Sequence, residues 1–144
     1  MKTMLRWAVL PGLLLLGACS DTDSATDGGA AALRLNEVLA KSDSGSDWLE
    51  LYNTSDQEVS LVGLGLRDSK NEWTFETGTI GQKGFVRVFC DDSGVNGRAS
   101  FKLSSDGESL TLVDGAGATL DAVTFPALGS DVSWGRYPDG TGEW

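Results

Sequence analysis

A single stretch of alternating residues, Asp47 to Asn53, constrains the fold of this chain most strongly. Two leucines alternate there with Trp48, Glu50 and Tyr52. Since successive side chains of a β-strand point to opposite faces, this period of two predicts a strand with the leucines on its apolar face. An unpaired buried charge is costly, so we expect Glu50 to have a cationic partner, an arginine, if its own face is covered.

Short runs with strand character follow one another along most of the chain, separated by polar or glycine-containing turns. Glycine supplies 19 of the 144 residues, a larger share than the roughly 7% of average proteins. Many tight turns between short strands would explain this share. About nine short strands without an amphipathic helix predict one all-β domain, an antiparallel β-sandwich. The expected strands are Leu33–Leu39, Asp47–Asn53, Val59–Arg67, Glu72–Glu76, Phe85–Cys90, Ser100–Leu103, Glu108–Val113, Ala118–Phe125 and Val132–Tyr137.

The N-terminus predicts an export signal. Lys2 and Arg6 precede an apolar run from Trp7 to Leu16, which Pro11 and Gly12 interrupt. This run is shorter than the roughly 20 residues that span a bilayer. The next residues, Gly17, Ala18 and Cys19, complete a match that resembles the lipobox of bacterial lipoproteins. That resemblance implies a signal peptide over residues 1–18 and lipid on Cys19. The alternative is an ordinary signal with a chance cysteine.

The predicted lipid anchor is followed by a predicted flexible tether, so that residues 19–32 comprise the lipidated cysteine and a disordered segment. From Ser20 to Ala32 the chain has no large apolar residue, and we expect none of it to join a core. Several acyl chains hold a protein stably at a membrane. Because Ser20 rather than an aspartate follows Cys19, the outer membrane is favoured if the source is Gram-negative.

Composition excludes several classes of function. The chain has no histidine, which removes the commonest general base, serine activator and zinc ligand. Loss of the signal peptide with its two basic residues would change the net charge from −10 to −12, and such a surface repels phosphate backbones. We therefore expect no catalytic residue, no cofactor, no metal and no nucleic acid partner.

Six blocks of sequence, in order across nearly all of Leu33–Trp144, resemble bacterial lamin tail domains. They are Leu35–Val38, Asp47–Asn53, Val59–Leu66, Phe101–Leu103, Gly107–Leu112 and Ser133–Gly140. The resemblance implies an immunoglobulin-like β-sandwich over residues 33–144, used as a binding or attachment module and often found beside secreted nucleases and other hydrolases. Family members continue beyond the stretch that matches Gly142–Trp144, so a C-terminal truncation of this chain is one expectation.

Two structural roles are predicted for individual residues. Glu50 is expected to form an ion pair with Arg136 or Arg67 that holds the sheets in register, and Arg136, in a Trp-Gly-Arg-Tyr strand, is expected to contact a carboxylate. Cys90 ends an apolar strand and is expected to be a buried small hydrophobe.

Two further sets of residues are candidates for binding. Trp73, Tyr137 and Trp144 lie near turns or the terminus and form a possible exposed surface that stacks on sugar rings, whereas Trp134 is expected to pack in the core. Calcium takes six to eight oxygen ligands, and a cluster of aspartates is the candidate site, with solvated acidic loops as the alternative. These aspartates are Asp43, Asp47, Asp91 and Asp92.

The resulting prediction is a non-enzymatic, lipid-anchored module that binds a protein or polysaccharide of a bacterial cell envelope. A second hypothesis is a fragment or accessory domain of a secreted, nuclease-like hydrolase whose catalytic part lies elsewhere. A third is a carbohydrate-binding or calcium-dependent adhesion module, which calcium-dependent melting would distinguish from the first.

Overall fold

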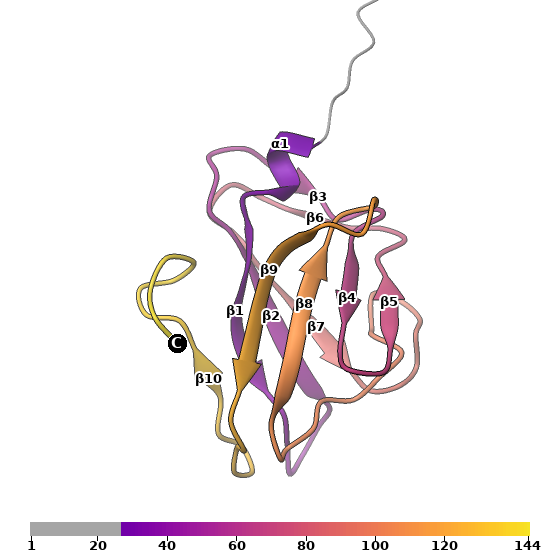
Figure 1. The fold of residues 1–144 in the computed structure, drawn as a ribbon, viewed down its shortest axis with the longest axis vertical. Helices are drawn as coiled ribbons and strands as arrows, with labels where there is room; N and C mark the ends of the chain where they lie inside the picture. Colours follow the sequence, from indigo (N-terminus) through magenta and orange to yellow (C-terminus); the bar gives the residue numbers. More distant parts are fainter. Residues whose placement is uncertain (1–26) are drawn as a thin grey trace, which may run out of the picture.

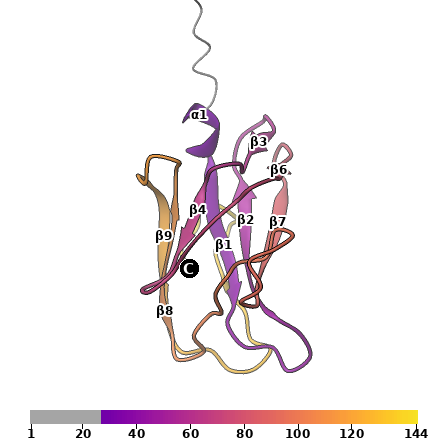
Figure 2. The same cartoon turned by 90° about the vertical axis from the view of Figure 1, so that its right-hand side faces the viewer.

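The computed structural model of the chain describes residues 27–144, which form two antiparallel sheets packed face to face (Figures 1 and 2). The first sheet has the order β10 (Trp134–Gly135), β1 (Leu33–Leu39), β2 (Asp47–Asn53) and β7 (Phe85–Cys90). The second has the order β5 (Glu72–Thr74), β4 (Gly65–Arg67), β8 (Glu108–Val113) and β9 (Thr119–Phe125). A small sheet of β3 (Val59–Ser60) and β6 (Thr79–Ile80) lies at one end. The predicted all-β antiparallel sandwich is confirmed.

The alternation of residues along the strands builds the core between the two sheets. Leu49 and Leu51 of β2 are fully buried, as are Leu110 and Leu112 of β8 in the second sheet. Burial of one leucine side chain contributes about 1.5–3 kcal/mol. The other face of β2 remains partly exposed. The pattern that predicted β2 therefore also determines which of its faces packs inward.

The predicted strand Val59–Arg67 is wrong, because a turn divides it between two sheets. Gly63 adopts a left-handed backbone with φ of 82°, and the amide of Leu64 donates a hydrogen bond to the carbonyl of Leu61 over 3.0 Å. The chain thereby passes from β3 to β4. Glycine adopts positive φ without steric cost, so the alternation of side chains continues in the sequence while the strand stops.

The predicted strand Ser100–Leu103 is also wrong. In the described part of the chain, a single bridge between Ala99 and Cys90 forms beside this segment. Phe101 and Leu103 are nevertheless buried in the core. Apolar side chains at alternate positions can pack inward from an irregular segment, and the sequence pattern does not separate this case from a paired strand.

The folded domain begins before Leu33. A short helix α1 (Asp27–Ala30) precedes β1, and Ala30 is buried in the core. The amide of Thr54 donates to the carbonyl of Ala32 over 3.0 Å. The predicted tether is therefore wrong over residues 27–32, because a small side chain can fill a gap that composition alone does not reveal. The predicted signal peptide 1–18, Cys19 and tether residues 20–26 lie outside the described residues. No helix within residues 27–144 is long and apolar enough to cross a membrane.

Candidate functional site: the aromatic face of β2 and β7

The outward side of β2 and β7 carries six side chains that we call the aromatic face. The register of the two antiparallel strands pairs Trp48 with Phe89, Glu50 with Arg87, and Tyr52 with Phe85. Both strands alternate with a period of two, so the residues between these six point into the core. The face therefore consists of one charged pair between two aromatic pairs.

Stacking contacts hold the side chains of the aromatic face in place. The guanidinium carbon of Arg87 lies 4.1 Å from the centroid of the Trp48 ring. At the other end the rings of Tyr52 and Phe85 stack with centroids 4.5 Å apart and an interplanar angle of 26°. Phe85 nevertheless keeps 48% of its surface exposed. Such cation–π and aromatic pairs each contribute about 0.5–1.5 kcal/mol beyond burial of area.

Glu50 does not form an ion pair with the arginine directly across from it. Its Oε1 accepts a hydrogen bond of 3.1 Å from Nδ2 of Asn36 in β1. A β-bulge between Leu35 and Glu37 places Asn36 as the extra residue. None of the ion pairs found among the described residues includes Glu50 or Arg87. The guanidinium of Arg87 therefore lies on an indole ring without a carboxylate partner.

The predicted ion pair between Glu50 and Arg136 is wrong, although Arg136 does contact a carboxylate. Both oxygens of Asp121 in β9 accept hydrogen bonds of 3.2 Å from Nη2 of Arg136. The alternative partner Arg67 binds Glu72 in the neighbouring strand, with Nε and Oε2 2.9 Å apart. Because β1 lies between β10 and β2 in the sheet, Arg136 is nearer to the edge of the second sheet than to Glu50.

Arg136 joins both sheets to the C-terminal segment. Its Nε donates to the carbonyl of Leu35 over 2.9 Å, and its Nη1 donates to the carbonyl of Gly142 over 3.1 Å. The Asp121 carboxylate also accepts a hydrogen bond of 2.9 Å from the amide of Leu35. The guanidinium carbon lies 5.0 Å from the Trp144 ring. These contacts serve as framework at the sandwich edge.

A turn near the C-terminus packs over β1 and borders the aromatic face. The buried side chain of Asn36 donates to Oδ1 of Asp139 over 3.0 Å and accepts from the amide of Gly140 over 2.8 Å. A Cβ atom on Gly140 would lie only 2.5 Å from Cδ1 of Tyr52. The turn thus lies directly against the Tyr52 ring and limits the aromatic face on the β1 side.

The three aromatic residues predicted to form a binding surface do not lie together. Trp73 is in β5 of the second sheet, partly buried and packed edge-to-face on Phe75 with ring centroids 4.5 Å apart. Trp144 stacks on Trp134 at 5.1 Å and packs against the core. Tyr137 is 89% exposed. The prediction is wrong for Trp144 because the terminus folds back, through the bridge between Tyr137 and Glu143.

Cys90 is fully buried, as predicted. Burial raises the pKa of its thiol far above the ordinary value, and nearby carboxylates raise it further. A thiol in this environment stays protonated and is not a nucleophile at neutral pH.

The four candidate calcium ligands do not converge. Asp91 forms an ion pair with Arg98. A hydrogen bond from Ser93, followed by that from Arg98, lowers the pKa of the Asp91 carboxyl. The amide of Asp43 instead donates to Oδ1 of Asp131 over 3.1 Å. Within residues 27–144, no group of three acidic or cysteine side chains is close enough together to hold a metal ion.

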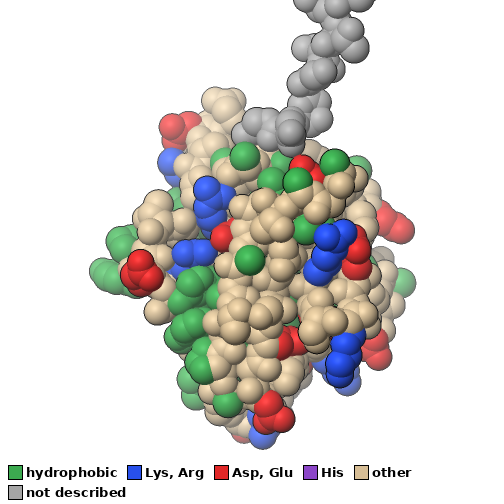
Figure 3. Space-filling model, viewed as in Figure 1, with side chains coloured by type: hydrophobic (Ala, Val, Ile, Leu, Met, Phe, Trp, Pro, Cys, Tyr) green, Lys and Arg blue, Asp and Glu red, His purple; other side chains and the backbone are tan. Residues whose placement is uncertain are grey.

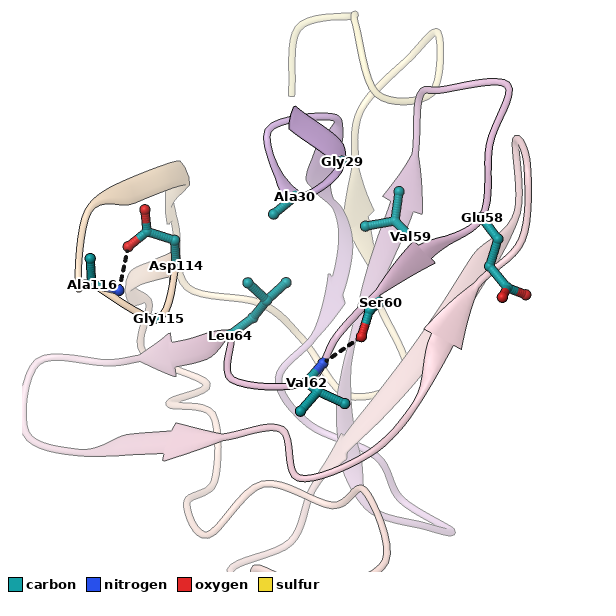
Figure 4. A pocket seen from close by; sticks show the side chains of 10 residues that line it. All are labelled: Gly29, Ala30, Glu58, Val59, Ser60, Val62, Leu64, Asp114, Gly115 and Ala116. Atoms are coloured by element: carbon teal, nitrogen blue, oxygen red, sulfur yellow. Dashed lines mark hydrogen bonds between the residues drawn. The ribbon is translucent and has the colours of Figure 1, made fainter. Parts of the chain in front are cut away.

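A cavity of about 690 Å³ lies at the end of the sandwich next to α1 (Figure 4). The Oγ of Ser60 accepts a hydrogen bond of 3.2 Å from the amide of Val62, and Oδ1 of Asp114 accepts one of 2.9 Å from the amide of Ala116. The Glu58 side chain points away from the cavity in Figure 4. The polar side chains around the cavity therefore either bond to the nearby backbone or point away from the cavity. They do not converge on a ligand position.

The outer face of the second sheet differs from the aromatic face. The view of Figure 3 shows mainly uncharged polar groups and backbone over β8 and β9. The hydroxyl oxygens of Ser109 and Thr124 lie there 2.6 Å apart. The two outer faces of the sandwich thus have different chemistry, and the aromatic face is the one with an unpaired cation and large apolar side chains.

Comparison with known proteins agrees with this architecture. A family model described as Lamin Tail Domain matches residues 27–127, more than half of the chain. The chain belongs to the lamin tail domain family. This confirms the resemblance to lamin tail domains for the five sequence blocks within residues 27–127, and it agrees with the predicted immunoglobulin-like β-sandwich. The match begins with α1 and includes both strands of the aromatic face, whereas Arg136 lies beyond it. A search of curated proteins found no match.

Proposed function

We propose that this lamin tail domain is a non-enzymatic binding module, lipid-anchored through Cys19 in a bacterial cell envelope, which attaches to another envelope macromolecule. The aromatic face is the observation that carries the proposal. Interface centres are enriched in tryptophan, tyrosine, phenylalanine and arginine. The aromatic face combines all four residue types on two neighbouring strands.

The segment between the proposed lipid anchor and the described domain is short. Cys19 precedes the first described residue, Asp27, by eight positions. Eight residues span at most about 29 Å when fully extended. Lipid on Cys19 would therefore keep the domain close to the membrane and still allow it to turn the aromatic face toward a neighbour.

The binding role is tested with a photo-crosslinking amino acid placed on either outer face. Benzoylphenylalanine at Phe85 reports on the aromatic face, and the same residue at the exposed position Ala122 in β9 is the matched control. In a bacterial host, we expect a light-dependent adduct with an envelope component from position 85 and none from position 122. Equal adducts from both positions, or none from position 85, would contradict the proposal.

The anchor is tested separately by metabolic labelling with an alkyne fatty acid. Cys19→Ser is expected to lose both the label and sedimentation with membranes, whereas the control Ser24→Ala keeps both. Membrane association of Cys19→Ser equal to that of the unaltered chain would refute lipid anchoring without bearing on the aromatic face.

A further inference from the structure

We infer that the partner of the aromatic face is an extended protein segment that adds as a strand to the free edge of β7 and presents one carboxylate to Arg87. This inference rests on the proposed function and specifies its ligand class. Three observations carry it: the direction of the backbone groups of β7, the unpaired guanidinium, and the contacts already made by the aromatic rings.

The backbone of β7 alternates between its two edges, and two hydrogen bonds show which residues face outward. The amide of Asn53 in β2 donates to the carbonyl of Gly84 over 2.9 Å, so Gly84 and every second residue after it face β2. On the opposite edge, the carbonyl of Phe89 accepts a bond of 2.8 Å from Ala99. By this alternation, Phe85 and Arg87 direct their backbone groups to the edge away from β2.

The Phe85 end of this edge is open. β7 is the last strand of its sheet, and within residues 27–144 the contact with Ala99 engages only the Cys90 end. Beyond the ladder with β2, the backbone groups of Phe85 and Arg87 make no hydrogen bond to another described residue. Exposed strand edges are templates for strand addition. Phe85 and Arg87 have their backbone groups at the free edge of β7 and their side chains on the aromatic face. An added strand would therefore lie next to the aromatic face.

The chemistry of the added strand follows from Arg87. Its cross-strand neighbour Glu50 has one carboxylate oxygen engaged by Asn36. None of the ion pairs found within residues 27–144 includes Arg87, so its guanidinium is available to a carboxylate from outside. Opposite charges on directly opposed residues stabilise neighbouring strands. The net charge of the whole chain is −10, which disfavours a segment with many acidic residues. One carboxylate, flanked at the second residue on either side by apolar side chains, fits this surface.

The contacts of the aromatic rings favour a peptide over a sugar. Trp48 already has Arg87 on one ring face, and Tyr52 and Phe85 stack on each other. A polysaccharide that binds by stacking would have to use the remaining ring faces. A peptide gains backbone hydrogen bonds that do not need an open ring.

The test uses a phage-displayed library of random nine-residue peptides, selected against the full-length chain in mild detergent. We expect enriched peptides with one acidic residue two positions from an apolar one. Replacing that acidic residue with its amide, or Arg87 with methionine, should weaken binding about tenfold, as expected for loss of one charge-assisted hydrogen bond. Lys70→Met, at an exposed turn away from β7, is the matched control and should bind normally.

A chemical control leaves the protein unaltered. Each selected peptide is prepared in two forms, N-methylated at one or the other set of alternate amides. Only the set that faces β7 supplies the donors for strand pairing, so one of the two methylated forms should not bind. Binding that survives N-methylation in both forms, binding that survives Arg87→Met, or a selection that enriches no peptide would overturn the inference. A crosslink from position 85 to a polysaccharide would also overturn it, while the proposed function would stand.

Discussion

Replacing Arg136 with methionine is expected to destabilise the domain by about 3–5 kcal/mol, the usual cost of removing one partner from a buried ion pair. Arg136 and Asp121 retain only 16% and 14% of their side-chain exposure. Methionine preserves much of the aliphatic stem, so the loss comes from the guanidinium. This change is the most direct test of the framework assigned to the sandwich edge.

The magnitude follows from what the substitution leaves behind. The Asp121 carboxylate would lose the one ion-pair partner that it has within residues 27–144, while remaining bonded to the amide of Leu35. The carbonyls of Leu35 and Gly142 would each lose a donor. Since domains are typically stable by about 5–15 kcal/mol, the loss is a large part of the total. For a domain of this size it corresponds to roughly 10–20 °C in Tm.

Urea unfolding followed by tryptophan fluorescence measures this effect. Arg67→Met is the matched control: Arg67 and Glu72 keep 39% and 49% of their side-chain exposure, and such exposed pairs contribute about 0–1 kcal/mol. Asp121→Asn and the double variant complete a cycle in which we expect a coupling energy above about 1 kcal/mol. A loss for Arg136→Met no larger than that for Arg67→Met would refute the buried pair as a source of stability.

Three further predictions concern other positions of the same fold. Asn36→Ala removes three hydrogen bonds and leaves the buried amide of Gly140 unpaired, so we expect a loss of about 2–4 kcal/mol in urea unfolding. Gly140→Ala forces a Cβ to within 2.5 Å of Tyr52 at φ of 68° and should cost more than Gly97→Ala, where φ is 74° and nothing lies within 4 Å. Burial raises the pKa of Glu108 above its ordinary value. Its contribution to stability therefore falls as pH rises from the ordinary pKa of a glutamate, about 4.3, to the raised pKa of the folded state. Glu108→Gln should gain stability relative to the unaltered chain over that rise in pH.

The strands with apolar side chains on one face and polar or mixed side chains on the other were predictable from the sequence. β1, β2, β7 and β8 have the expected bounds, because each has an apolar set of side chains that must turn inward. The burial of Cys90 followed from the same pattern. In these segments, local sequence and tertiary packing require the same arrangement.

Features that depend on strand order were not predictable from the same pattern. Alternation places Glu50 on a face, but it does not say that β1 lies between Glu50 and Arg136, and so it led to the wrong ion pair. The turn at Gly63 was missed because glycine fits both a strand and a left-handed turn. Of the aromatic face, Phe85, Arg87 and Phe89 were missed, although the alternation of β7 with its buried Val88 contained the signal.

The framework and the candidate site depend on the same irregularity in β1. The bulge between Leu35 and Glu37 makes Asn36 the extra residue, and this places its amide within hydrogen-bond distance of Glu50. A regular strand would lack that donor, and Glu50 would be free to pair with the opposed Arg87, as opposite charges on neighbouring strands do. The bulge thus withdraws the internal carboxylate and leaves the guanidinium for an external one. β-Bulges re-aim side chains next to functional sites in many proteins, and here the re-aimed side chain determines which charge the aromatic face presents.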